Sequence, residues 1–178
     1  MNVNTFFMKH LCIFLFIILS CTAASAQTPD TVPPYKKNPH IPAFHILQTD
    51  STWFTKEQLP KYEYTAIIYF SPTCGHCQFT AQDLVKKMDS LKNVLFVFVS
   101  YNSIEEIREF YIKYRLNTFH NVRIGRDPKY FIPSFYRVEA TPFVAVYNRK
   151  GILMQVFDPP HKPAMEAYEL INLIYKKK

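Results

Sequence analysis

Residues 65–80 read TAIIYFSPTCGHCQFT, and the interpretation of the whole chain starts from this stretch. Its first six residues are a continuous run of β-branched, aromatic and other apolar side chains, which is typical of a strand buried on both faces of a sheet. A Ser-Pro pair interrupts the run, and apolar residues then recur with helical spacing up to about Leu91. The sequence therefore predicts a strand, a short loop and a helix, with Cys74 and Cys77 at the start of the helix.

The spacing of the two cysteines favours thiol chemistry. A helix N-terminus carries unpaired N–H groups and a partial positive charge, and both stabilise a thiolate. Because the thiolate is the nucleophile, Cys74 is predicted to attack, and the more covered Cys77 is predicted to resolve the mixed disulfide. Between them stand Gly75 and His76, whose imidazole can add positive charge and exchange protons. No separate cofactor is expected, since the redox group is the Cys74–Cys77 disulfide itself.

Other uses of a cysteine pair fit the sequence less well. A bridge over so short a loop removes little chain entropy, so it would be a weak structural staple. Haem attachment needs a histidine where Gln78 stands, and zinc needs four ligands, so no bound metal is predicted. Copper held by the cysteine pair and His161 stays an alternative. A thiol peroxidase would carry a proline and a threonine where Ile67 and Ser71 stand.

The N-terminus has the layout of a secretory signal peptide over residues 1–26. Lys9 precedes an apolar run, and a small-x-small cleavage site ends at Ala26. The run is shorter than the ~20 residues of a membrane span. Cleavage removes two of the four cysteines, and an exported chain left with one close pair has no disulfide framework. The sequence predicts an exported, periplasmic protein. A membrane tether by an uncleaved signal or a lipidated Cys21 is the alternative.

The rest of the chain divides into a linker and one domain. Residues 27–43 hold five prolines and predict an extended linker, and residues 44–178 form the predicted domain. The linker is followed by a short strand over 43–47. Residues 49–63 predict a turn, a second short strand and a connection. The net charge of +7 comes without an arginine-rich helix or a basic-aromatic stripe, so no nucleic acid partner is predicted. A weak attraction to anionic surfaces or acidic partners is compatible with the charge.

The second half of the domain predicts further strands and helices. Residues 94–100 form a second buried strand, and Ser103 with Glu106 predicts a capping box at the start of the next helix. Residues 117–137 are less regular, with a helix start at Asp127. The remaining elements are a third strand over 143–147, a turn over 148–151, an antiparallel partner strand and a last helix that opens at Pro163. A parallel βαβ unit followed by a hairpin predicts an α/β fold, a mixed central sheet with helices on both faces.

A second motif supports a redox site. The stretch VEATPF places Thr141 and Pro142 at the mouth of the third strand, where a sheet tolerates proline. Together with the cysteine pair, it predicts a cis Thr141–Pro142 bond. That geometry would turn the Thr141 backbone toward the cysteines, where it can hydrogen-bond an extended partner chain. The predicted partners are therefore protein or peptide thiols and disulfides.

These stretches resemble the thioredoxin superfamily, in particular exported TlpA/ResA-like proteins with a short N-terminal hairpin before the core. The matching segments are IPAFHILQTDSTWFTKEQL, AIIYFSPTCGHCQ and VEATPFVAVYNRKGIL. The resemblance implies a thioredoxin-like fold and a thiol–disulfide oxidoreductase that reduces disulfides of exported proteins with electrons from an upstream donor. It also implies that Cys74 is the nucleophile, Cys77 the resolving thiol and Pro142 the cis-proline.

Three positions depart from the family pattern. Thr73 replaces the tryptophan common before the first cysteine, and Ile68 replaces the buried aspartate of thioredoxins. Thr80 replaces the glutamate of ResA-like proteins, so the proton acceptor for Cys77 is not identified. The Gly-His dipeptide resembles that of protein disulfide isomerases, which favours a more oxidising couple. An oxidase or isomerase is therefore an alternative, and a non-enzymatic copper chaperone or binding module is a further one.

Overall fold

The computed structural model describes residues 32–158 and 164–176 of the 178-residue chain. The described strands are β1 (His45–Gln48), β2 (Trp53–Thr55), β3 (Tyr64–Tyr69), β4 (Val94–Ser100), β5 (Val122–Arg126), β6 (Phe143–Asn148) and β7 (Leu153–Phe157). The α-helices are α2 (Pro34–Lys37), α3 (Gly75–Lys86), α4 (Ile104–Lys113), α5 (Phe131–Tyr136) and α6 (Ala167–Tyr175). Short 3₁₀ helices span Lys56–Gln58, Met88–Leu91 and Leu116–Thr118.

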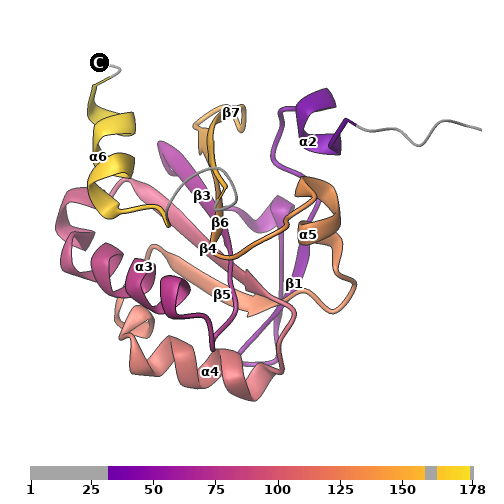
Figure 1. The fold of residues 1–178 in the computed structure, drawn as a ribbon, viewed down its shortest axis with the longest axis vertical. Coiled ribbons are helices and arrows are strands. Elements are labelled where there is room, and N and C mark those ends of the chain that lie inside the picture. The colour runs from indigo at the N-terminus through magenta and orange to yellow at the C-terminus, as the bar shows by residue number, and fades with distance from the viewer. Residues whose placement is uncertain (1–31, 159–163, 177–178) are drawn as a thin grey trace, which may run out of the picture. The chain divides into compact units, whose positions relative to one another are not determined.

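The described strands form one mixed sheet in the order β2-β1-β5-β4-β3-β6-β7 (Figure 1). Strands β3, β4 and β5 are parallel, and α3 and α4 provide the crossovers between them. Strands β6 and β7 continue the sheet antiparallel on one side, while β1 pairs antiparallel with β5 on the other. This arrangement confirms the predicted mixed central sheet and the short N-terminal hairpin, which is the β1–β2 pair.

Helices cover both faces of the sheet, as the sequence predicted (Figure 1). Along β3, Ala66 and Ile68 face the core that contains α3, α4 and α6. The alternate residues, Ile67 and Tyr69, face the core that contains α5. Because side chains alternate across a strand, a central strand between two layers of helices must be apolar at every position. This requirement explains the unbroken apolar runs that identified β3 and β4.

The predicted linker over residues 27–43 is wrong for the part that the structure describes. Residues 34–37 form α2, whose Tyr35 ring lies 5.6 Å from that of Tyr136 in α5. Ile41 is buried, and its N–H donates to Gly151 O at 3.0 Å. The domain therefore begins before residue 44, because apolar side chains between the prolines pack on the sheet. The predicted signal peptide and Cys21 lie outside the described residues.

The region 117–137 contains a strand that the sequence analysis did not assign and a helix that begins later than predicted. Strand β5 pairs with β4 and β1, and α5 begins at Phe131 rather than near Asp127. Asp127 instead accepts hydrogen bonds from the N–H groups of Ile132 (2.7 Å) and Lys129 (3.3 Å) and so orders the turn before α5. The last helix also starts later than predicted, at Ala167, and the predicted start at Pro163 lies outside the described residues.

Two local predictions are confirmed. Ser103 accepts from the N–H of Glu106 (3.2 Å), and the Glu106 carboxylate accepts from the N–H of Ser103 (3.0 Å), which completes the capping box of α4. The turn between β6 and β7 closes with the N–H of Gly151 donating to Asn148 O at 2.8 Å.

Within the part of the chain that the structure describes, no helix has the length and apolar composition needed to cross a membrane.

The close approach of β1 to β5 depends on Gly125. A Cβ atom at this position would lie 2.6 Å from the backbone oxygen of Leu47. We expect Gly125→Ala to lower the free energy of unfolding by about 1–3 kcal/mol, as overpacking does in buried sites. Urea unfolding measures the change. The matched control is Gly75→Ala, since no atom lies within 4 Å of a Cβ there, and a control that loses as much stability would contradict the steric argument.

Candidate active site

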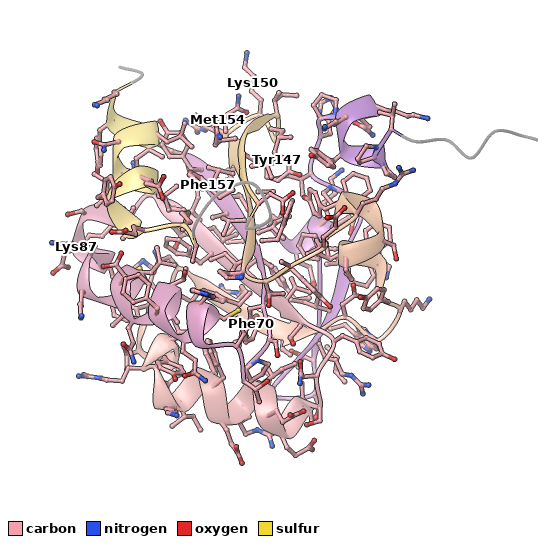
Figure 2. The ribbon with its side chains drawn as sticks, viewed as in Figure 1. Phe70, Lys87, Tyr147, Lys150, Met154 and Phe157 are labelled. Carbon is pink, nitrogen blue, oxygen red and sulfur yellow. The ribbon has the colours of Figure 1, made fainter. Side chains whose placement is uncertain are left out.

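The cysteine pair lies in the loop and first helical turn that follow β3. Phe70, labelled in Figure 2, is the last residue before the loop and is buried against Phe98 and Phe110. Cys74 is the N-cap residue of α3, and Cys77 lies in the first turn of the helix. The strand on one side of the loop and the helix on the other therefore hold both sulfur atoms in place.

The Cys74 side chain caps the N-terminus of its own helix, α3. The N–H of Cys77 donates to Cys74 Sγ at 3.4 Å, so the sulfur occupies the place of a capping oxygen. In the thiol form, Cys74 Sγ–H donates to the backbone oxygen of Thr141, also at 3.4 Å. The second bond exists only while Cys74 is protonated, whereas the first becomes stronger when the sulfur is negative.

The two thiols have opposite acid strengths. Burial acts to raise the pKa of Cys74, but hydrogen bonds with the Cys77 and Thr141 side chains and with the Cys77 and His76 backbone outweigh it, so the pKa is lowered. Cys77 is 2% exposed, and burial raises its pKa to about 12. The half-buried Cys74 is therefore the thiol that ionises first, which is the property that an attacking thiol requires.

Residues around the pair order the loop, and the sequence analysis had not assigned them this role. The N–H of Cys74 donates to Ser71 O at 3.1 Å. The side-chain amide of Gln78 donates to Pro72 O at 2.9 Å. Gln78 served in the sequence analysis only to exclude haem attachment. A polar residue one turn into a helix that follows a proline-containing loop is the signal that could have identified it.

The Thr141–Pro142 segment lies next to the cysteines, and its peptide bond is cis, as predicted. The register of β6 on β3 pairs Phe143 with Tyr69, so the start of β6 lies beside the end of β3. This register brings the Thr141 backbone to Cys74 although the two residues are far apart in the sequence. His76 and Gly75 are both exposed on the first turn of α3, where a partner can reach them.

Two of the three departures from the family pattern, Ile68 and Thr80, are buried and have structural roles. Ile68 is buried in the core under α3, and Thr73 is exposed. Thr80 is 1% exposed and donates its hydroxyl to Met165 O at 3.2 Å, which links α3 to the segment before α6. These positions therefore do not supply an acid near Cys77.

Two other carboxylates that could have approached the dithiol have partners elsewhere. Asp83 accepts from the N–H of Ala167 at 2.7 Å, at the start of α6. Glu63 accepts from the side chain of Asn93 at 3.2 Å, near the opposite end of β3. Apart from burial, the groups that shift the pKa of Cys77 are Ser71, Cys74 and Thr141, none of which is a carboxylate.

The histidines show no metal-binding arrangement in the described residues. His40, His45 and His120 are exposed, and no three His, Cys, Asp or Glu side chains within residues 32–158 and 164–176 lie close enough together to hold a metal ion. His161, the third ligand of the copper alternative, lies outside the described residues, so this alternative is not tested.

Aromatic residues near the site divide into core and surface. Phe70 and Phe143 are each 1% exposed and belong to the core, whereas Phe79 on α3 is 51% exposed. A pocket of about 280 Å³ opens between the loop at Pro72–Thr73 and α4, where Phe110 and Glu109 line it. The surface beside Cys74 therefore offers both apolar and charged contacts.

Known proteins resemble this chain in part of its sequence and in its fold. No known protein-family pattern matches the chain. By sequence, the chain is 26% identical over 123 residues, 67% of its length, to Protein disulfide isomerase-like 1-1 of Arabidopsis thaliana. The match covers 23% of that relative, so the chain spans less than a quarter of the curated relative's length.

Solved structures with the same architecture include redox proteins of several kinds. A secreted disulfide oxidoreductase of Mycobacterium tuberculosis, homologous to E. coli DsbE, has a TM-score of 0.63 at 21% identity, covering 75% of this chain and 96% of that one. The thioredoxin domain of thiol-disulfide oxidoreductase BVU-2223 from Bacteroides vulgatus has a TM-score of 0.62 at 13% identity, covering 78% and 94%. Peroxidoxin BcpB from Mycobacterium tuberculosis has a TM-score of 0.66 at 9% identity, covering 78% and 96%.

The protein has a thioredoxin-like fold, as the sequence analysis expected. The names of these relatives describe disulfide oxidoreductases and a protein disulfide isomerase-like protein. Since a peroxidoxin shares the fold, the choice among redox reactions depends on the residues of the site rather than on the architecture.

The contrast between the two thiols can be measured by alkylation. We expect the iodoacetamide rate of Cys74 to rise with pH and to reach half its maximum at a lower pH than that of an ordinary cysteine, because the thiolate reacts and the pKa of Cys74 is lowered. In a Cys74→Ser variant, Cys77 should stay unreactive over the same pH range, since its pKa is raised to about 12. Equal pH profiles for the two thiols would contradict the assignment.

Proposed function

We propose that the protein is a thiol–disulfide oxidoreductase that reduces disulfides of exported proteins with its Cys74-Gly75-His76-Cys77 dithiol. The observation that carries the proposal is the asymmetry of the two thiols. Cys74 is half-buried with a lowered pKa, and Cys77 is buried with a raised one. Directional exchange needs one thiol that attacks and a second that is protected until the mixed disulfide has formed.

In the first step, the Cys74 thiolate attacks one sulfur of a client disulfide. The client S–S bond breaks, a bond forms between Cys74 Sγ and the attacked sulfur, and the other client sulfur leaves as a thiolate that takes up a proton. The N–H of Cys77 stabilises the attacking thiolate from 3.4 Å. The backbone of Thr141, within hydrogen-bond distance of Cys74, is suited to hold an extended client segment beside the attacked bond.

In the second step, Cys77 loses its proton and its thiolate attacks Cys74 Sγ. The mixed disulfide breaks, the Cys74–Cys77 disulfide forms, and the second client sulfur leaves reduced. The protein has then lost two electrons to the client, so an upstream dithiol donor must reduce it before the next cycle. Proton loss from Cys77 is the demanding part of this step, because the thiol is buried and its pKa is about 12.

A second candidate function is that of a disulfide oxidase or isomerase. The Gly75-His76 dipeptide and the similarity to Protein disulfide isomerase-like 1-1 of Arabidopsis thaliana favour it. The direction of electron flow distinguishes the candidates, because the same atoms serve both. The resemblance to TlpA/ResA-like proteins favours reduction.

Export to a periplasm-like compartment is part of the proposal. The signal-like residues 1–26 support it, and a structural relative is a secreted protein. A membrane tether through an uncleaved signal or a lipidated Cys21 would keep the site in the same compartment.

The reduction potential of the Cys74–Cys77 couple tests the direction. Equilibration in glutathione or dithiothreitol buffers, read by alkylation and mass spectrometry, should give about −250 mV or lower for a reductant. A value near −180 mV or higher would replace the proposed reductase with an oxidase or isomerase.

Turnover of insulin disulfides with added reductant tests the enzyme class. The wild type should accelerate insulin reduction, and Cys74→Ser should abolish the effect because the attacking thiol is lost. Cys77→Ser should accumulate a mixed disulfide on Cys74, visible as an added client mass. Failure of the wild type to turn over insulin, combined with stoichiometric copper binding that Cys74→Ser abolishes, would favour the chaperone alternative.

A further inference from the structure

A second pocket lies at the end of the sheet opposite the dithiol. It has a volume of about 440 Å³ and lies between the segment before β3 and the turn from β6 to β7. Thr65 near the start of β3 lines it, whereas the cysteines follow the end of the same strand. At 3.3 Å per residue, Thr65 lies about 13 Å from Tyr69 at the end of β3, and the loop that carries Cys74 follows Tyr69. In Figure 2, Lys150 lies at the top edge of the view, and Phe70 lies below it in the interior of the molecule.

Positive charge dominates the lining of this basic pocket. Four cationic side chains contribute to it, and they are Lys56, Lys61, Arg149 and Lys150. His40 also lines the pocket, and no aspartate or glutamate does. None of the four cations forms an ion pair with a residue in the described parts of the chain. The nearest acid in the sequence, Glu57, interacts with Lys56 but is exposed outside the lining.

Hydrogen bonds fix the walls that carry these charges. The Asn148 side-chain oxygen accepts from the N–H groups of Lys150 (2.9 Å) and Ile152 (3.1 Å), so the turn that projects Arg149 is ordered. On the adjoining wall, the N–H of Leu153 donates to Pro39 O at 2.7 Å. The fold therefore sets the backbone positions from which Arg149 and Lys150 reach the pocket. Their mutual repulsion is relieved by a bound anion.

The floor of the pocket is partly apolar. Ile41, Leu59 and Tyr62 line it, together with the buried Thr65. The Thr65 hydroxyl has no side-chain hydrogen bond with any described residue, so it is available to a ligand. A phosphate ester matches this combination, because its charged oxygens suit Lys and Arg while its organic part can contact the floor.

We propose that the basic pocket binds a phosphate group, carried either by a soluble phosphate ester or by the headgroup of an anionic lipid. In the second case, contact with a membrane surface would hold the dithiol on the far side of the domain, facing clients. This proposal is independent of the redox direction, since it concerns the opposite end of the sheet.

The first test is a titration of the full chain, with its own N-terminus, by inorganic phosphate. In the wild type, we expect added phosphate to change the amide ¹H–¹⁵N shifts of the pocket residues. In the Lys56→Gln/Lys61→Gln variant, the same addition should change these shifts much less. The matched control is Lys86→Gln/Lys87→Gln, which removes the same charge from the end of α3 and should bind like the wild type. Thermal melting and insulin turnover confirm that both variants are folded.

The second test separates the two sources of phosphate. Sedimentation compares vesicles of phosphatidylcholine alone with vesicles that also contain phosphatidylglycerol. If the source is a headgroup, the wild type should bind to the phosphatidylglycerol vesicles. Each charge removed from the pocket should then weaken this binding about fivefold, both in Lys56→Gln/Lys61→Gln and in Arg149→Gln/Lys150→Gln. Shifts with phosphate but no gain from phosphatidylglycerol would assign a soluble ester. The proposal is overturned if neither probe engages the pocket, or if the control variant loses as much binding as the pocket variants.

Discussion

The hydrogen bond from the Cys77 N–H to Cys74 Sγ is the interaction on which the chemistry of this protein depends. It exists because α3 begins directly after Cys74, its N-cap residue, so the first amides of the helix have no carbonyl partner within it. The sulfur at the N-cap position accepts a hydrogen bond from such an amide, and the pKa of Cys74 is lowered. The same helical turn carries Cys77 into the core, where burial has the reverse effect. A single helix start thus produces two thiols of opposite character.

The remainder of the domain keeps this helix start in place. Phe70 packs between the rings of Phe98 and Phe110, which anchors the strand end that leads into the loop. Further along α3, Thr80 and Asp83 bind backbone groups of Met165 and Ala167, so the helix is held to the C-terminal segment. Ile68 and Thr80, which depart from the family pattern, are thus buried in the core. The site is built on rigid elements, which suits a reaction that depends on sulfur positions.

Local patterns predicted much of the fold and the reactive pair. Buried runs identified β3, β4 and β6, and the capping box located α4 to the residue. Strand β5 was missed because Val122–Arg126 mixes apolar, basic and glycine residues. It is a strand because β4 and β1 pair with it from both sides, and Gly125 permits the close approach of β1. The proline-rich segment was assigned to a linker on composition, yet Ile41 is buried against the β6–β7 turn.

The sequence by itself determined the cysteine spacing, the helix start and the Thr-Pro pair, because capping, periodicity and turn preferences act between residues a few positions apart. Only the tertiary structure decided that Thr141 O lies 3.4 Å from Cys74 Sγ, since this contact depends on the register of β6 against β3. It also decided that Lys56 and Arg149, from separate segments, line one pocket. Such contacts arise from strand pairing between distant segments, and residue order along the chain carries no local signal for them.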